Sequence, residues 1–176
     1  SLILVAGQLN EKSQGGKPDG INARKDGLIT VPRGPNGWRR SVYVLQRRTQ
    51  IPTLLTTFDL PRMEPNCVKR PESTVAPQAL HLLNDATVNQ LAGHFAKRLI
   101  KEAKDISAQL NRAYWLALSR APRNEELLLD RSTLEQLSAQ WKKELGDKGT
   151  VEAIHEKALT NYCRALLNSS EFQYVD

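Results

Sequence analysis

Residues 84–99 read NDATVNQLAGHFAKRL, and this stretch decides the fold class. Its apolar residues recur three or four positions apart, as they do on one face of an amphipathic α-helix: Val88, Leu91, Ala92, Phe95 and Leu99. Asn84-Asp85 directly precedes this stripe and has side chains that can cap the N-terminus of a helix. The stretch therefore predicts a helix that begins after Asp85 and buries one face in a core.

The same signals recur through the rest of the chain. Asp105, Asn124 and Thr150 are placed to cap three further helices, and Gly146 and Asn168-Ser169 are placed to end two of them. The predicted apolar faces comprise Ile106, Leu110, Ala113, Tyr114 and Ala117; Leu127, Leu134, Leu137, Trp141 and Leu145; and Val151, Ile154, Ala158, Tyr162, Ala165 and Leu166. Residues 86–176 are therefore expected to form antiparallel helices joined by short loops.

The pattern changes towards the N-terminus. Residues 10–37 are dense in Gly, Pro, Asn and Asp, which predicts a long irregular segment. Ser41–Gln46 alternates β-branched and aromatic residues, so it is the best candidate for a strand, and Ile51–Phe58 predicts a short helix. Another short helix is expected from Ala76 to Leu83, with Leu80 and Leu83 facing inward.

These segments together predict a mainly α fold. We expect a helical bundle of about four to five helices, with a long irregular N-terminal arm and at most one short strand pairing. The arm is expected over residues 1–38 and the helical domain over residues 39–176, which divides at residue 85 into a polar segment and the antiparallel helices. Because the chain has no initiator Met, we expect the arm to continue from an upstream region of a longer protein.

The net charge of +6 is distributed unevenly along the chain. Residues 1–75 contain 12 Lys and Arg against 6 Asp and Glu, whereas residues 76–176 contain 13 of each. A local basic field favours an anionic partner, unless the arginines pair internally. No aromatic–basic platform or helix-turn-helix signature is present, so the sequence disfavours nucleic acid as that partner. No apolar run approaches the roughly 20 residues of a membrane helix, so no membrane insertion is expected.

Nine residues form what we call the polar belt: Arg39, Arg40, Tyr43, Arg47, Arg48, Asp59, Arg70, Gln78 and Asn84. They lie among apolar residues such as Phe58 and Leu80, so packing of those side chains would draw the polar groups inward. A buried polar group without a partner costs about 1–3 kcal/mol, so the polar belt must satisfy itself or bind a ligand. Three interpretations stay open: an internal network, a binding surface, and a catalytic site with Asp59 as acid or base.

The remaining reactive side chains show no site pattern. Cys67 and Cys163 are 96 residues apart and predict either one disulfide in an exported protein or two buried thiols. The three histidines, His81, His94 and His155, have no ligand spacing, so no metal site is predicted. The haem-attachment motif Cys-x-x-Cys-His is absent, and no cofactor is predicted.

Several short motifs occur together in this chain. They are Arg39-Arg40-Ser41 with Tyr43, Arg47-Arg48, Phe58-Asp59 with Pro61, Cys67 with Arg70, Thr74 with Gln78-Ala79-Leu80, Leu82-Leu83-Asn84, Arg120 with Pro122 and Glu125, and Leu166 to Phe172. In this combination the chain resembles the planctomycete-specific C-terminal domain of unknown function. The segment from Ser1 to Gly16 also fits, so the resemblance covers essentially the whole chain.

The resemblance implies a context rather than a chemistry. Such domains are found in large multidomain proteins that often carry a planctomycete cytochrome c-type domain, and the implied location is the periplasm or cell envelope of an exported protein. The implied role is a non-catalytic binding or scaffolding module that contacts other domains of its parent chain or an anionic polysaccharide. The alternative is an enzyme domain that acts on polysaccharide, including sulfated polysaccharide, so enzymatic activity is left open.

Overall fold

A computed structural model of the chain describes residues 1–12, 15–34, 37–47, 49–58, 60, 75–146 and 149–173. The chain forms two compact units. The helical unit combines Ser1–Gly7 with Asp85–Asp176, and the loop unit is Gln8–Asn84. The division expected from the sequence, with an arm over residues 1–38, stays a prediction.

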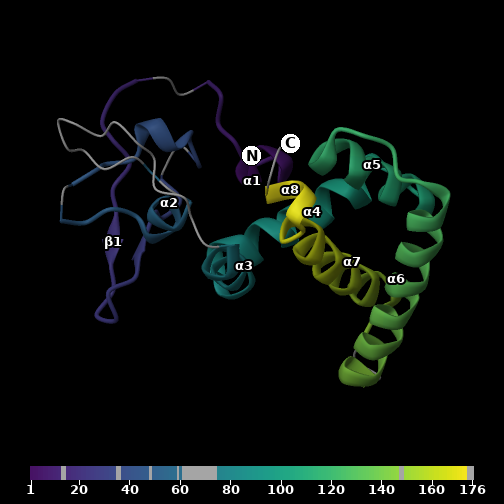
Figure 1. Cartoon of the computed structure of the whole chain (residues 1–176). Helices are drawn as coiled ribbons and strands as arrows, with labels where there is room; N and C mark the ends of the chain where they lie inside the picture. Colours follow the sequence, from purple (N-terminus) through teal and green to yellow (C-terminus); the bar gives the residue numbers. More distant parts are fainter. Residues whose placement is uncertain are drawn as a thin grey trace. The chain divides into compact units, whose positions relative to one another are not determined.

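The helical unit is built from four long helices, as the apolar stripes predict (Figure 1). They are α4 (Ala86–Glu102), α5 (Ile106–Leu118), α6 (Asn124–Leu145) and α7 (Val151–Leu167), with short helices α1 (Leu2–Val5) and α8 (Ser170–Gln173) at the ends of the unit. Helix α7 packs against both α4 and α6, and α6 and α7 form a hairpin. The prediction of a mainly α fold with a helical bundle is confirmed.

Side-chain caps fix where these helices begin. The carboxylate of Asp85 accepts hydrogen bonds from the backbone N–H groups of Thr87 and Val88 at 2.7 and 3.0 Å. Asp105 and Thr150 cap α5 and α7 as predicted. The predicted cap at Asn124 is wrong by one residue, because Arg123 occupies the N-cap and α6 begins at Asn124.

The core of the helical unit follows the predicted stripes closely. All five stripe residues of α4 are buried, together with Leu110, Ala113 and Tyr114 of α5, Leu134 of α6, and Ala158, Tyr162 and Leu166 of α7. Three predicted core residues are exposed instead: Ile106 is 40% exposed, Val151 is 79% exposed, and Ala165 is exposed as well. Ile106 and Val151 are the first residues of α5 and α7.

Arg98 joins the short helix α1 to the long helices. Its Nη1 donates hydrogen bonds to the backbone oxygens of Leu4 and Val5 at 3.2 and 2.9 Å, and these carbonyls lie at the C-terminal end of α1. Its Nε donates to Glu102, which also accepts from Arg112 of α5. A positive side chain at a helix C-terminus is favourable, because the last carbonyls of a helix lack partners.

The described residues of the loop unit form two α-helices, a 3₁₀ turn and one short hairpin. Strands β1 (Asn22–Ala23) and β2 (Ile29–Thr30) pair antiparallel, with Asn22 opposite Thr30. Gly27 closes the turn with a φ of 83°, a conformation that glycine adopts without strain. The backbone N–H of Ile29 donates to Thr53 Oγ1 at 2.9 Å and so ties the hairpin to α2 (Thr53–Thr57).

The strand predicted at Ser41–Gln46 is wrong. Ser41–Tyr43 forms a 3₁₀ turn instead, in which the N–H groups of Tyr43 and Val44 donate to Arg40 and Ser41 three residues back. Only a single isolated bridge, between Asp19 and Val44, pairs this segment with another in the part of the loop unit that the structure describes. The N–H groups of Tyr43 and Val44 are therefore satisfied locally, and the bridge adds two bonds to Asp19, which donates to the Tyr43 carbonyl and accepts from the Leu45 N–H.

Helix α3 (Val75–Asn84) buries a different face from the one predicted. Leu80 and Leu83 are 60% and 37% exposed, whereas Gln78 and Leu82 are 3% and 1% exposed. Residues four apart lie on one face of a helix, so Gln78 and Leu82 define the buried stripe. The side chain of Gln78 is satisfied there, because its Nε2 donates to the backbone oxygen of Thr57 at 3.0 Å.

Candidate functional site

Arg39 is a buried residue of the polar belt, with only 7% exposure. Its Nε lies 3.1 Å from both carboxylate oxygens of Asp19, and its Nη2 lies 2.9 Å from Asp19 Oδ1. Nη1 and Nη2 also donate to the backbone oxygens of Gly15 and Lys17, both at 2.7 Å. The guanidinium lies 4.9 Å from the centre of the Tyr43 ring, within the range of a cation–π contact.

These contacts make Arg39 a structural residue. Hydrogen bonding to the Asp19 carboxylate raises the pKa of Arg39 above its ordinary value, so the guanidinium stays charged. The backbone of Asp19 bonds to Tyr43 and Leu45, each at 2.8 Å, so side chain and backbone join the same two segments. For Arg39 the interpretation as an internal network therefore holds.

The other described residues of the polar belt divide into two groups. Gln78 is buried against α2, and Tyr43 is half-buried beside Arg39. Arg40, Arg47 and Asn84 are exposed; Arg47 Nη1 lies 3.4 Å from Gln50 Oε1, at the long end of hydrogen bonding. The structure thus brings Arg39 and Tyr43 together and leaves the exposed arginines facing solvent.

Three residues of the polar belt, Arg48, Asp59 and Arg70, lie outside the described residues, as does Cys67. Cys163 lies in α7 and is fully buried, and this burial raises the pKa of its thiol. The Cys67–Cys163 disulfide and the catalytic role of Asp59 therefore stay predictions.

The net charge of the protein resides in the loop unit. Residues 8–84 contain 12 Lys and Arg and 6 Asp and Glu, which gives +6, whereas residues 1–7 and 85–176 together contain 13 of each. The exposed cations of the described part of the loop unit are Lys12, Lys17, Arg24, Lys25, Arg33, Arg40 and Arg47. Arg24 is offset by Asp26, whose carboxylate lies 2.9 Å away. The loop unit therefore carries a surface excess of positive charge.

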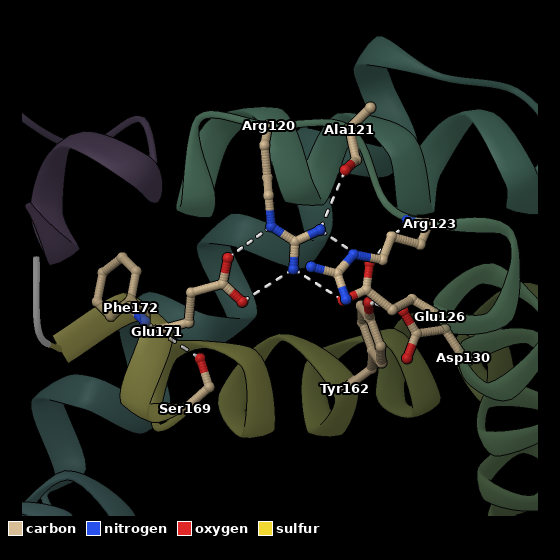
Figure 2. A network of polar contacts seen from close by, with 9 residues as sticks. All are labelled: Arg120, Ala121, Arg123, Glu126, Asp130, Tyr162, Ser169, Glu171 and Phe172. Carbon is tan, nitrogen blue, oxygen red and sulfur yellow. Dashed lines mark hydrogen bonds and ion pairs between the residues drawn. The ribbon is translucent and has the colours of Figure 1, made fainter. Parts of the chain in front are cut away.

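A second polar network, in the helical unit, is centred on Arg120 (Figure 2). This residue lies in the corner between α5 and α6, directly after Ser119, which ends α5 with a left-handed φ of 57°. Its guanidinium faces the carboxylates of Glu126 on α6 and Glu171 on α8. The hydrogen bonds to Glu126 measure 2.8 and 2.7 Å, and those to Glu171 measure 2.5 and 2.9 Å.

Every N–H group of the Arg120 guanidinium has an acceptor. Four bind the two carboxylates, and Nη1 also donates to the backbone oxygen of Ala121 at 3.1 Å. The guanidinium also lies 5.1 Å from the centre of the Tyr114 ring. A saturated arginine between two carboxylates has no donor left for a ligand, so this network fixes structure rather than binding a substrate.

The electrostatics of this network agree with that role. Hydrogen bonds from Arg120 and from the backbone N–H of Arg123 lower the pKa of Glu126 to about 2. Hydrogen bonding to Arg120 also lowers the pKa of Glu171. Nearby, the Tyr162 hydroxyl donates to Asp130 Oδ2 at 2.8 Å, and burial, followed by this bond, raises the pKa of Tyr162. Tyr162 therefore stays protonated and joins α7 to α6.

Sequence reasoning did not identify this network. It named Arg120, Pro122 and Glu125 as a motif, but the partner of Arg120 is Glu126. A Glu in the first turn of a helix that follows an arginine corner is a signal that could have suggested this pair. Glu171 is 51 residues from Arg120, and no local pattern connects them.

The histidines form no metal centre in the described residues, where no cluster of three or more His, Cys, Asp or Glu could hold a metal ion. His155 instead contacts the buried Gln109 through Nε2 and Oε1 at 2.9 Å. Among the helices that the structure describes, none has the length and apolar character needed to span a membrane.

A family model described as PSD1, a protein of unknown function (DUF1553), matches residues 1–134. The chain belongs to this family. No curated protein and no solved structure matches the chain. The PSD1 match contains the loop unit and extends into α6, so it includes both Arg39 and Arg120 together with Glu126. It ends before Glu171, so the PSD1 model covers only part of the Arg120 network.

Arg120→Met should remove a pH-dependent part of the stability. Glu126 and Glu171 have depressed pKa values in the folded state, so their charges stabilise the fold above the ordinary value of 4.5. This stability is lost as the pH falls below 4.5, for Glu126 towards its folded-state pKa of about 2. We expect the melting temperature of the variant to be lower by about 5 °C at pH 7, with the difference shrinking as the pH falls below 4.5. Differential scanning calorimetry of the variant and the wild type from pH 2.5 to 7 measures the difference in melting temperature and its dependence on pH.

The matched control is Lys97→Met. Lys97 pairs with Glu156 at 3.5 Å across two well-exposed side chains, so its loss should change the melting temperature little at any pH. A difference between Arg120→Met and the wild type that stayed constant down to pH 2.5 would contradict the assignment of the acid-sensitive stability to this network.

Proposed function

We propose that this PSD1 chain is a non-catalytic binding or scaffolding module of a larger exported protein, and that its loop unit contacts an anionic partner. The observation that carries the proposal is the location of the charge: the whole excess of +6 belongs to residues 8–84. Arg39 is already neutralised by Asp19, so the unpaired excess belongs to other cations, several of which are exposed.

The chemistry of these cations indicates the kind of partner. Arg33, Arg40 and Arg47 are exposed arginines, and a guanidinium can bind the oxygens of a carboxylate or sulfate in a forked geometry. A basic surface attracts acidic molecules over distances comparable with the Debye length, about 8 Å at physiological salt. An acidic polysaccharide, or an acidic neighbouring domain of the same parent chain, fits this surface.

The helical unit supplies the scaffold in this proposal. Its charges balance, and its arginine clusters are paired internally, with Arg120 between two glutamates and Arg98 bound to Glu102 and α1. The wider context follows from the sequence resemblance: a planctomycete parent protein at the cell envelope, often with a cytochrome c-type domain. The enzymatic alternative depends on Asp59, and no observation on the described residues favours it.

A thermal-shift experiment with matched polymers tests the binding role. Dextran sulfate and polygalacturonate should raise the melting temperature of the protein at low salt, uncharged dextran should not, and 0.5 M NaCl should abolish the effect, because exposed ionic contacts are screened. A ligand at about 100 times its Kd contributes about 2.7 kcal/mol to stability, which such a scan resolves.

Charge-reversal variants locate the effect. Arg40→Glu with Arg47→Glu should reduce the shift, whereas Lys142→Glu with Lys143→Glu, which reverses two exposed charges on α6 of the helical unit, should leave it unchanged. Absence of a shift with every polyanion at low salt would overturn the proposed function.

A further inference from the structure

Two short helices lie at the ends of the helical unit, and each is fastened to the long helices by one arginine. Arg98 donates to the carbonyls of Leu4 and Val5 in α1, and Arg120 donates to Glu171 in α8 (Figure 2). A four-residue helix has too few internal hydrogen bonds to be stable alone, so each depends on its contacts with the bundle. Those contacts decide whether either helix can detach while the bundle stays folded.

The two short helices differ in what they bury. In α1, Val5 is 5% exposed, and the adjoining Ala6 is 1% exposed. In α8 none of the four residues is buried, although the helix packs against α5 and α7, and its one aromatic residue, Phe172, is half-buried. Burial of apolar area is the main favourable term in folding, so α8 is stabilised much less by burial than α1 is.

Polar contacts hold α8 in place. The Glu171 carboxylate accepts from Nε and Nη2 of Arg120 at 2.5 and 2.9 Å. Ser169 Oγ accepts from the backbone N–H of Phe172 at 3.3 Å. Gln173 Oε1, by contrast, is buried without a hydrogen-bond partner among the residues that the structure describes. A buried oxygen without a donor costs free energy, and detachment of α8 removes that cost.

Detachment of α8 leaves no buried charge without a partner. Arg120 also donates to Glu126 through Nη1 and Nη2 at 2.8 and 2.7 Å, and this ion pair does not involve α8. The Glu171 side chain is 50% exposed while it is bound, so water hydrates it readily once it is released. Breaking the contact between Arg120 and Glu171 therefore costs less than breaking an ion pair in the core.

We propose that α8 is a latch, which detaches from the bundle and rebinds while the rest of the helical unit stays folded, and that the ion pair between Arg120 and Glu171 sets how often it opens. In the open state the surfaces of α5 and α7 that α8 covers become accessible, and Arg120 stays bound to Glu126. The latch goes beyond the proposed function and does not depend on an anionic partner. It also lies outside residues 1–134, which the PSD1 model covers.

Native-state hydrogen exchange of the full chain, followed residue by residue by NMR at urea concentrations below the unfolding transition, tests the proposal. The amides of Phe172 and Gln173 should exchange at least about 100-fold faster than those of Leu159 and Tyr162 in α7, because local opening needs less free energy than global unfolding. Their rates should change little with urea, since detachment of four residues exposes little surface. The rates of the core amides should rise steeply.

A charge-neutralising variant tests the ion pair. Glu171→Gln should speed exchange of the α8 amides about fivefold, because it removes the negative charge that faces Arg120. Glu135→Gln is the matched control, since Glu135 is exposed on α6, and it should leave these rates unchanged. In α1 the Val5 amide should exchange as slowly as the core amides do, because this residue is buried.

Each other result overturns a stated part of the proposal. Exchange of the α8 amides at the rates and with the urea dependence of the core would overturn the latch, because α8 would then open only when the bundle unfolds. Equal α8 rates in the wild type and Glu171→Gln would overturn the role of the ion pair. Fast exchange of the Val5 amide with little urea dependence would overturn burial as the difference between the two short helices.

Discussion

Arg39→Met should lower the melting temperature of the loop unit by about 10 °C, an effect far larger than that of any exposed cation in the same unit. The substitution keeps an apolar stem of similar length and removes the hydrogen bonds to Asp19, Gly15 and Lys17. It also leaves the Asp19 carboxylate, whose side chain is 15% exposed, without its positive partner. Loss of one member of a buried ion pair is costly because the remaining charge is poorly hydrated.

Two measurements separate this effect from a general loss of stability. Calorimetry gives the melting temperature. Hydrogen exchange followed by mass spectrometry shows which segments of the chain are destabilised. Exchange should accelerate in the peptides that contain Asp19 and Leu45, whose N–H groups bond across the two joined segments, and should not change in α4 or α7.

Arg40→Met is the matched control, because Arg40 is the adjacent residue and is exposed. It should change the melting temperature of the loop unit by no more than about 2 °C. Equal melting temperatures for Arg39→Met and Arg40→Met would show that the ion pair with Asp19 does not hold the loop unit together.

Phe95→Ala should destabilise the helical unit by about 3–5 kcal/mol. Phe95 lies on α4 with 0% exposure, on the stripe that includes Leu91 and Leu99. Its replacement by alanine removes most of a buried aromatic side chain and leaves a cavity that the rigid neighbouring helices can fill only in part. Urea unfolding followed by circular dichroism at 222 nm measures the change as a shift in the midpoint.

Ile100→Ala on the same helix is the comparison that isolates burial. Ile100 is 37% exposed, so its truncation should cost less than half as much as that of Phe95. A cost for Phe95→Ala below that of Ile100→Ala would contradict the placement of Phe95 at the centre of the core.

Local signals explain why the helical unit was predictable. An aspartate that caps a helix acts within three residues, as Asp85 does with Thr87 and Val88, so its role can be recognised without the tertiary structure. The stripe from Val88 to Leu99 is long enough for its periodicity to identify the buried face. The errors at Ile106 and Val151 concern the first residues of their helices, and a periodic stripe does not show which of its end residues are covered.

The loop unit was less predictable because its structure depends on contacts between residues that are far apart in the sequence. Helix α3 has only ten residues, so its periodicity does not identify one buried face. The sequence favoured Leu80 and Leu83 on that face, whereas the structure buries Gln78 and Leu82. Gln78 is buried together with a hydrogen bond that its side chain donates to the carbonyl of Thr57, 21 residues away. Similarly, Ser41–Tyr43 has the alternation of a strand but forms a 3₁₀ turn, since in the described residues the segment pairs through one isolated bridge.

The sequence by itself determined that this protein is mainly helical, where most of its long helices begin and end, and that its positive charge resides in residues 1–75. These properties depend on side chains a few positions apart or on simple sums of charge. Only the tertiary structure decided which arginines are internal. Arg39 meets Asp19 from 20 residues away, and Arg120 meets Glu171 from 51 residues away. Such pairs form because folding brings distant segments together, and at Arg39 burial also requires the charge to have a partner.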